Sequence, residues 1–395
     1  MNVLELKTAY LKYMGEHPPV WINRRPTKLV DFPSPDHFAL NGYSQWFARR
    51  LTRDPWSSEA FSHCARCMSE MATPGQPPFF MSLEDVGWNM FDRRKAIKDN
   101  LGFIEEIGLD PARLKVSVWK GGKLSGAGLG PASEGAGFKK FAAEGFELPR
   151  DEQSIKAWKE CGLNETQIVE IGESEKIDPS GSGTVHLDTN EYFAGIRSGI
   201  HYPVNGRYVE IGESVVDQFL KKSAAAKLSV AGAALEDDVD SDRLLLRLKA
   251  KTVVGGFVAE RLAMALNGSE TAFDLAPYRD LEAMLVKLGR GADADRARVH
   301  TAVARIPAVI WLVHDGANLP KGNTKTRQAI FRGTLKTVVE NMAALNLDSD
   351  ETYTGLFKQA CSFYAQDDDF KSIASLELAC LDEIKKQKRR MKAAK

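Results

Sequence analysis

The stretch Val254-Gly255-Gly256-Phe257-Val258-Ala259-Glu260-Arg261-Leu262 decides the fold. Its small and apolar residues predict a buried strand, and Glu-Arg follows where a helix would begin. About 190 residues earlier, His63-Cys64-Ala65-Arg66-Cys67 leads through a loop to Pro77-Pro78-Phe79-Phe80-Met81. This pattern predicts two neighbouring strands with Arg66 near the end of the first. If Arg66 and Arg261 meet, they would clamp a triphosphate, because the charged planar guanidinium matches phosphate oxygens bidentately.

Composition indicates a globular protein that remains in the cytoplasm. The chain has 395 residues, 43% hydrophobic content and a formal net charge of zero, which argues against a dedicated polyanion binder. It has no run of 18 apolar residues, and its amino-terminal residues 1–7 lack the apolar core of a signal peptide. Five cysteines, an odd number, are typical of reduced thiols. We therefore expect a cytoplasmic protein that does not insert into a membrane.

No metal site is predicted from the cysteines and histidines. Cys64 and Cys67 form a C-x-x-C pair, but a zinc or redox site would need a second ligand pair or a thioredoxin-like context. We interpret both as small apolar residues on a buried strand. The seven histidines are scattered and contain no H-x-x-x-H pattern. Any Mg²⁺ would arrive with a nucleotide.

Hydrophobic periodicity predicts an α+β region up to about residue 265. Helical spacing and strand-like runs alternate irregularly, which favours an antiparallel sheet over a doubly wound parallel sheet. A glycine-rich stretch, 121–137, predicts a loop. The expected helices are 4–15, 93–107 and 151–161, and the expected strands are 116–119, 168–172, 184–187, 208–211 and 244–254.

The remainder of the chain, from residue 276, has an almost wholly helical pattern with breaks at 289–292, 318–323 and 347–350. We therefore predict three parts: a sheet-containing domain over residues 1–270, a helical domain over 271–383, and a basic tail over 384–395.

The two opening stretches resemble motifs 2 and 3 of class II aminoacyl-tRNA synthetases. The chain is similar, in order, to the catalytic and helical domains of alanyl-tRNA synthetase from about Leu4 to about Phe357. The segments that carry this resemblance are 36–47, 96–97, 109–114, 116–118, 151–158, 162–163, 210–219 and 314–320. The resemblance implies an antiparallel sheet flanked by helices, followed by an all-helical domain that meets the acceptor stem of tRNA.

The resemblance also implies amino-acid activation with ATP and Mg²⁺, which forms an aminoacyl adenylate and releases pyrophosphate. Arg66 would contact the α-phosphate and the amino-acid carboxylate. Arg261 would contact the γ-phosphate, with Glu260 beside it. Phe79 or Phe80 would stack on adenine.

Departures from the family argue against alanine as the substrate. Val254 replaces the aspartate that holds the substrate ammonium in the family, and Glu213 replaces a pocket asparagine. Ammonium recognition would pass to Glu213 or Asp217, with Gly256 lining the same pocket. The glycine-rich segment 178–184 falls where the family has a turn beside this pocket.

The acceptor of the activated amino acid stays open between tRNA, a carrier protein and a small molecule. The family's strongly basic helix is reduced here to a few cations, which predicts weak, salt-sensitive tRNA binding. These candidate residues are Lys325, Arg327, Arg332 and Lys336, with Lys385 to Lys392 near the end of the chain. Two alternatives remain: a catalytically silent paralogue that binds tRNA, a nucleotide or a partner protein, and an unrelated α+β protein.

Overall fold

The structure is a computed structural model. It describes residues 1–16, 51, 56, 59–68, 77–89, 93–124, 146–179, 181, 183–187, 193–222, 234–236, 245–250, 252–289, 295–314, 325–368, 370 and 376–393.

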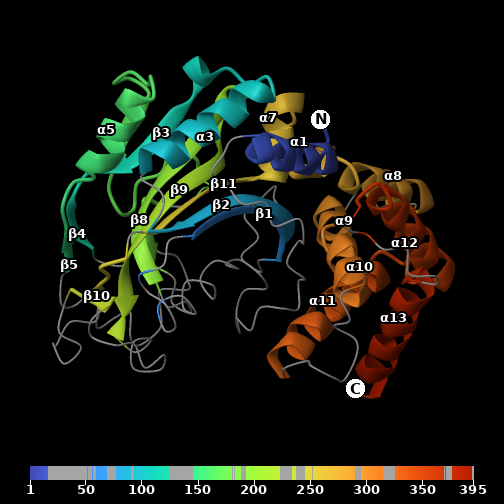
Figure 1. The fold of residues 1–395 in the computed structure, drawn as a ribbon. Helices are drawn as coiled ribbons and strands as arrows, with labels where there is room; N and C mark the ends of the chain where they lie inside the picture. The colour runs from blue at the N-terminus through green and yellow to red at the C-terminus, as the bar shows by residue number, and fades with distance from the viewer. Residues whose placement is uncertain are drawn as a thin grey trace.

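A curved sheet of nine described strands forms the centre of the first part of the chain (Figure 1). Its main strand order is β1-β2-β11-β9-β8-β3-β6, with β10 beside β9 and β7 beside β8. All pairs are antiparallel except β3 with β6. The strands are β1 (Glu59–Met68), β2 (Phe79–Trp88), β3 (Lys115–Trp119), β6 (Ile168–Ile171), β7 (Val185–Leu187), β8 (Phe193–Val204), β9 (Arg207–Lys221), β10 (Leu245–Arg247) and β11 (Thr252–Val258); β4 (Gly122–Leu124) and β5 (Phe146–Leu148) pair separately.

Helices α1, α3, α5 and α7 cover one face of this sheet, called here the helix-covered face (Figure 1). Their apolar residues form one continuous core with the strand residues that point toward them, such as Leu83 of β2 and Phe257 of β11. Side chains alternate between the two faces of a strand, so the neighbours Glu84 and Gly256 belong to the opposite face. The bounds are α1 (Val3–Glu16), α3 (Arg93–Glu106), α5 (Glu152–Glu160) and α7 (Ala259–Asn267), with the short 3-10 helix η1 (Pro111–Arg113).

The hairpin β8–β9 turns at Asn205 and Gly206, whose φ angles are +48° and +80°. Positive φ at both central residues is the type I′ arrangement, which matches the twist of the two strands and favours Asn-Gly. The pairing slips by one residue between Ile200 and His201, where β9 contains an extra residue. This β-bulge reverses the alternation of β9 beyond that point.

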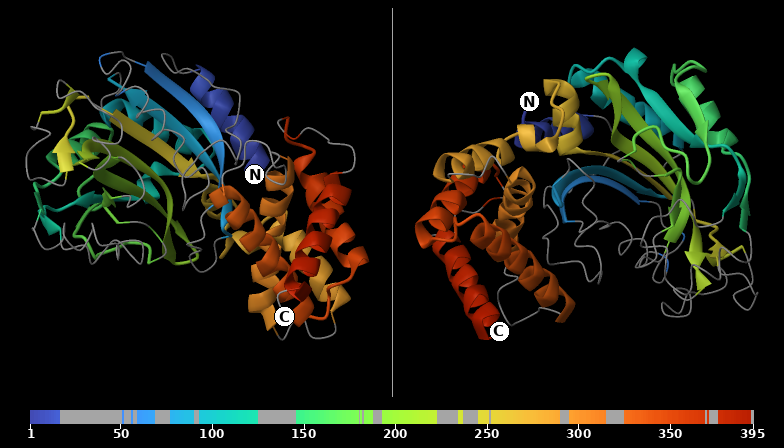
Figure 2. Two further views of the ribbon diagram at one scale, coloured as in Figure 1. Left: turned by 90° about the horizontal axis from the view of Figure 1, so that it is seen from below. Right: turned by 180° about the vertical axis from the view of Figure 1, so that it is seen from behind.

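The last third of the described chain is helical, and its helices lie beside the ends of β1 and β2 (Figures 1 and 2). Tyr278 donates a hydrogen bond of 3.0 Å to the backbone oxygen of Phe79, and Lys7 of α1 forms a buried ion pair with Asp367. The helical region therefore packs firmly against the sheet. Its elements are η5 (Ala272–Asp274), α8 (Tyr278–Leu288), α9 (Arg296–Val303), α10 (Ile306–His314), α11 (Lys325–Ala344), α12 (Asp350–Tyr364) and α13 (Leu376–Ala393).

The predicted fold class is confirmed: an α+β arrangement with a mainly antiparallel sheet, flanking helices and a helical carboxy-terminal region. The expected strand 244–254 is wrong in detail, because bends at Lys249 and Ala250 separate β10 from β11 and the latter continues to Val258. The expected loop 121–137 begins with β4, and its residues after 124 lie outside the described part. Residues 384–393 are not a separate tail, because they form the last turns of α13 with Ile384 and Gln387 buried.

Division into separate domains at residue 270 stays a prediction. Among the described residues, no helix has both the length and the apolar character needed to cross a membrane.

Candidate functional site

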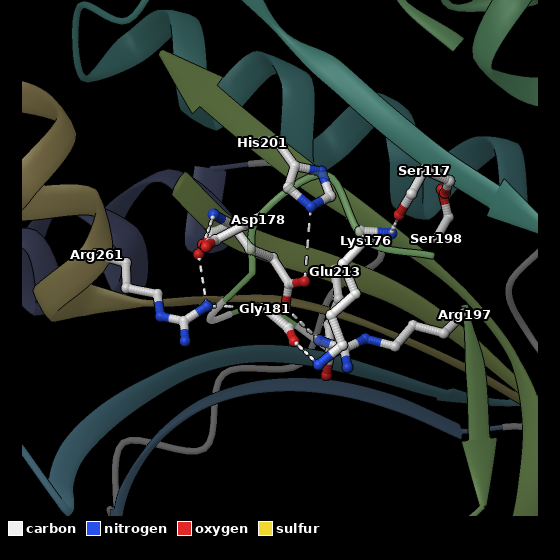
Figure 3. A network of polar contacts seen from close by, with 11 residues as sticks. Ser117, Lys176, Asp178, Gly181, Arg197, Ser198, His201, Glu213 and Arg261 are labelled. Carbon is white, nitrogen blue, oxygen red and sulfur yellow. Dashed lines mark hydrogen bonds and ion pairs between the residues drawn. The ribbon is translucent and has the colours of Figure 1, made fainter. Parts of the chain in front are cut away.

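A network of charged side chains occupies the face of the sheet opposite the helices (Figure 3). Glu210 and Glu213 are three residues apart on β9, so regular alternation would send them to opposite faces. The β-bulge changes this outcome, because Glu210 pairs with His201 while Glu213 pairs with Gly199. His201 and Gly199 are two residues apart and share a face. The bulge therefore brings both carboxylates to one side of the sheet.

Glu210 is the buried centre of the network, with its side chain 4% exposed. Nη2 of Arg197 lies 2.6 Å from its Oε1. Arg261, from the first turn of α7, donates from Nη1 to the backbone oxygen of Glu210 at 2.9 Å and lies 3.8 Å from Oε1. The backbone N–H of Glu210 donates to Oδ2 of Asp178 at 2.8 Å. These charge-assisted contacts compensate the cost of removing Glu210 from water.

Arg197 joins the two carboxylates, because its Nε forms an ion pair with Oε2 of Glu213. The three side chains differ in exposure: Arg197 is 12% exposed, Glu210 is 4% exposed and Glu213 is 34% exposed. Glu213 is therefore the carboxylate of this network that a ligand can reach most readily.

Glycines allow the surrounding chain to approach Glu210 closely. The glycine-rich segment contributes Gly181. Its backbone N–H donates to the backbone oxygen of Asp178, and its backbone oxygen accepts a hydrogen bond of 2.8 Å from Nζ of Lys176. A Cβ on Gly181 would lie 2.6 Å from Oε2 of Glu210, and a Cβ on Gly199 would lie 2.8 Å from Cε1 of His201. Larger residues at either position would force the network apart.

His201 is a neutral member of the site at physiological pH. Its Nε2 lies 3.7 Å from Oε2 of Glu210. Burial lowers the pKa of His201, and the nearby Glu210 carboxylate offsets this only in part. Because its imidazole is buried and neutral, His201 is suited to positioning Glu210 rather than to carrying charge.

Arg66 takes a different environment from Arg261. Arg66 pairs across the strands with Met81, whose side chain belongs to the core on the helix-covered face. The Cζ atom of Arg66 lies 3.7 Å from the ring centroid of Trp311 in α10. Arg261 instead contacts Glu210 of the opposite face. The structure therefore does not bring the two arginines together as the sequence suggested, because alternation along β1 directs Arg66 toward the helical region.

The other residues expected to bind the nucleotide are buried in packing contacts. Glu260 accepts the backbone N–H of Met81 at 3.0 Å, which ties α7 to β2. Phe79 packs edge-on against Tyr364, with ring centroids 6.3 Å apart, and Phe80 packs against Cys67. Neither ring is exposed for stacking on adenine in this arrangement.

The pocket residues expected from the sequence lie close to the network. Val254 is buried between Val86 and Val215, and Gly256 pairs with Glu213. A Cβ on Gly256 would meet the backbone oxygen of Leu83, which explains the glycine. The backbone of Asp217 pairs with Gly195; its side chain lies outside the described part.

Four of the residues expected to contact tRNA belong to α11, and the basic run from Lys385 to Lys392 belongs to α13. Arg332 and Lys336 are exposed, and Lys336 lies 3.7 Å from Glu340. The side chains of Lys325 and Arg327 lie outside the described part.

Sequence reasoning missed Arg197 and His201; it placed the segment that begins with Asp178 beside the pocket but assigned no role to Asp178 and no central position to Glu210. A signal was present: Arg197, Gly199 and His201 alternate with Ile196, Ser198 and Ile200, as expected for a strand. The Asn-Gly pair that follows marks the hairpin.

No known protein family and no curated protein matches the sequence. Some solved structures are similar to the chain at low scores. Apo histidyl-tRNA synthetase of S. aureus is 9% identical, with a TM-score of 0.38 and 69% of each chain covered. A pyrrolysyl-tRNA synthetase of Desulfitobacterium hafniense is 12% identical, with a TM-score of 0.34 and coverage of 69% of this chain and 72% of that one. An ATP phosphoribosyltransferase regulatory subunit/histidyl-tRNA synthetase of Bacillus halodurans is 11% identical, with a TM-score of 0.36 and coverage of 67% and 79%. At these identities and TM-scores no activity, substrate or partner of these proteins is transferred to this chain.

Proposed function

We propose that the protein activates an amino acid with ATP, as an alanyl-tRNA synthetase-like ligase whose substrate is not alanine. The supporting observation is the network around Glu210, in which the half-buried carboxylate of Glu213 pairs with Arg197, and Arg197 and Arg261 both lie beside Glu210. An amino acid is a zwitterion, so its binding site needs a carboxylate for the ammonium and cations for the carboxylate. The network offers both on one face of the sheet.

In this proposal Glu213 receives the substrate ammonium, because it is the most exposed carboxylate of the network. Arg197 contacts both glutamates and would keep Glu213 ionised and oriented. Buried Glu210, supported by His201 and Asp178, would hold Arg197 and Arg261 in place. Such prior positioning of charges is the main contribution that a protein makes to this reaction.

ATP would bind toward the first turn of α7, where Arg261 supplies a guanidinium for its phosphates. Attack of a carboxylate oxygen on the α-phosphorus would form the aminoacyl adenylate and release pyrophosphate. The described residues contain no cluster of three or more His, Cys, Asp or Glu side chains that could hold a metal ion. In this proposal Mg²⁺ would arrive on the nucleotide and neutralise its phosphate charge.

Arg66 stays a predicted nucleotide ligand. To reach a phosphate it would have to leave the ring of Trp311, which packs among Tyr364 and Phe370 in the core of the helical region. This contact favours the alternative, a catalytically silent paralogue that binds tRNA or a partner protein, because it gives Arg66 a structural role.

An amino-acid panel in ATP–pyrophosphate exchange separates the two functions. We expect exchange with at least one amino acid other than L-alanine, reduced by Glu213→Gln because the ammonium loses its counter-charge. Exchange fastest with L-alanine would overturn the substrate assignment. No exchange with any amino acid, with or without total tRNA, would support the silent paralogue.

The acceptor is proposed to be tRNA, held weakly by cations of α11 and α13, two helices that pack together. On α13, Arg389, Arg390 and Lys392 are exposed, whereas Ile384 is buried, so truncation at residue 384 would damage the core. Replacing these three cations by glutamine should weaken tRNA binding and lessen its salt dependence. No binding of labelled tRNA even at low salt would point to a carrier protein or a small molecule as the acceptor.

A further inference from the structure

A row of small polar residues crosses the helix-covered face of the sheet, away from the network around Glu210. The register places Ser62 beside Asp85, Asp85 beside Gly255, and Gly255 beside Ser214, on four successive strands. Asn100 reaches this row from α3. The side chains of Ser62, Asp85 and Ser214 are fully buried, and Asn100 is 1% exposed.

The polar atoms of this row have no hydrogen-bond partner in the described part of the chain. They include both carboxylate oxygens of Asp85, both amide atoms of Asn100, and the hydroxyls of Ser62 and Ser214. Each buried polar group without a partner costs about 1–3 kcal/mol, so several together would cancel much of the stability of a domain. Such a cluster calls for a partner that the described residues do not supply.

Gly255 shows where that partner would lie. A Cβ on Gly255 would be 2.5 Å from Oδ1 of Asp85 and 2.9 Å from Nδ2 of Asn100. These two atoms are therefore at most 5.4 Å apart, the sum of the two distances. They are not hydrogen-bonded to each other. A separation of this size can be spanned by one small bridging ligand.

The donors are hard oxygens with a single negative charge. Asparagine O and N are exchanged by a 180° flip, and neither amide atom of Asn100 has a partner that would oppose the flip. Asn100 can thus present an oxygen beside Asp85, with Ser214 on the neighbouring strand. The nearest charged side chains on α3, Lys95 and Asp99, form an ion pair and neutralise each other.

We propose that a monovalent cation, with Na⁺ as the test case, binds above Gly255 between the sheet and α3, held by oxygens of Asp85, Asn100 and Ser214. One positive charge balances the carboxylate, whereas a divalent ion would leave net charge in an apolar core. Aromatic rings lie next to the row: the centroids of Phe103 and Phe257 are 5.6 Å apart, and Tyr10, whose buried hydroxyl also has no hydrogen-bond partner in the described part of the chain, packs edge-on against both. The bound cation would fix α3 on β2 and β11, whose opposite face carries the pocket residue Gly256. This proposal does not depend on amino-acid activation.

The test is the thermal stability of the full chain at pH 8 and constant ionic strength in NaCl, KCl or choline chloride. Burial raises the pKa of Asp85 to about 7, with Asp99 adding to the rise and Lys95 opposing it, so its carboxyl is ionised at pH 8. A cation present at about ten times its Kd favours the folded state roughly tenfold, which raises the Tm by about 2 °C in a chain of this size. We expect this rise in Na⁺ relative to choline, and its loss in Asp85→Asn.

Asp99→Asn is the matched control, because it removes a carboxylate from the same helix region without touching the proposed site. It should keep the Na⁺ dependence. Equal Tm values in all three salts would overturn the proposal and leave ordered water as the partner, as would a Na⁺ effect that persists in Asp85→Asn. If Asp85→Asn does not fold, ²³Na NMR line broadening decides: the parent chain should broaden the signal, and Ser214→Ala should weaken this effect. No broadening by the parent chain would also overturn it.

Discussion

Replacing Arg197 by methionine tests whether the network around Glu210 is a buried, mutually dependent unit. The substitution keeps most of the side-chain length but removes the charge that contacts Glu210 at 2.6 Å and Glu213. Removing one partner of a buried ion pair costs about 3–5 kcal/mol, because the remaining charge stays buried without compensation. Arg261, 3.8 Å from the Glu210 carboxylate, still compensates it in part. We therefore expect a loss of about 3 kcal/mol in the free energy of unfolding, measured by urea denaturation at pH 7.5.

Arg150 provides a matched control, because it also bridges two glutamates, Glu170 and Glu152, but does so at the surface. Its side chain is 41% exposed, against 12% for Arg197. Exposed ion pairs contribute little, so Arg150→Met should unfold at nearly the same urea concentration as the parent. Equal losses in the two variants would refute the argument that burial gives the Arg197 contacts their strength. A second test is Arg197→Met combined with Glu210→Gln, which should recover part of the lost stability.

Three further predictions concern the nucleotide, pH and the pocket. Arg261→Ala should reduce ATP–pyrophosphate exchange about tenfold to a hundredfold, the loss expected for one charge-assisted contact of about 1.5–3 kcal/mol; unchanged exchange would remove Arg261 from the phosphate site. Burial raises the pKa of Glu260 to about 7. The contribution of Glu260 to the free energy of unfolding is therefore complete below a pH of about 4.5, the pKa in the unfolded chain, and is lost as the pH rises through 7. Glu260→Gln should remove about 3 kcal/mol of this change in the free energy of unfolding between pH 4.5 and 8. If the free energies of the parent and of Glu260→Gln change in parallel with pH, the assignment is contradicted. Val254→Asp should lower the Tm, because it places a charge between Val86 and Val215; a Tm equal to that of the parent would show that a carboxylate is tolerated there.

Local pattern predicted many of the helices and strands, but it missed β8 and gave only the first residues of β9. The helices predicted at 4–15, 93–107 and 151–161 correspond to α1, α3 and α5. The strand that ends in Glu260 and Arg261 is β11 followed by α7. These predictions succeeded because burial of one helix stripe or one strand face imposes a period of 3.6 or 2 on the sequence itself. Cys64 and Cys67 were interpreted as small apolar residues on a buried strand because no second ligand pair accompanies them, and both are buried in β1.

The site depended on features that no local period contains. Arg66 and Arg261 were expected to meet, but the face on which Arg66 lies follows from the register of β1 against β2, and Trp311, which covers it, is 245 residues away in the chain. Glu210 and Glu213 share a face only because a bulge in the β8–β9 ladder shifts the alternation by one residue.

The sequence by itself therefore determined the fold class, the strand-to-helix step at Arg261 and the chemical character of the pocket residues. Tertiary structure alone decided which charges meet, because an ion pair between distant residues is set by register and packing rather than by the spacing of its members along the chain.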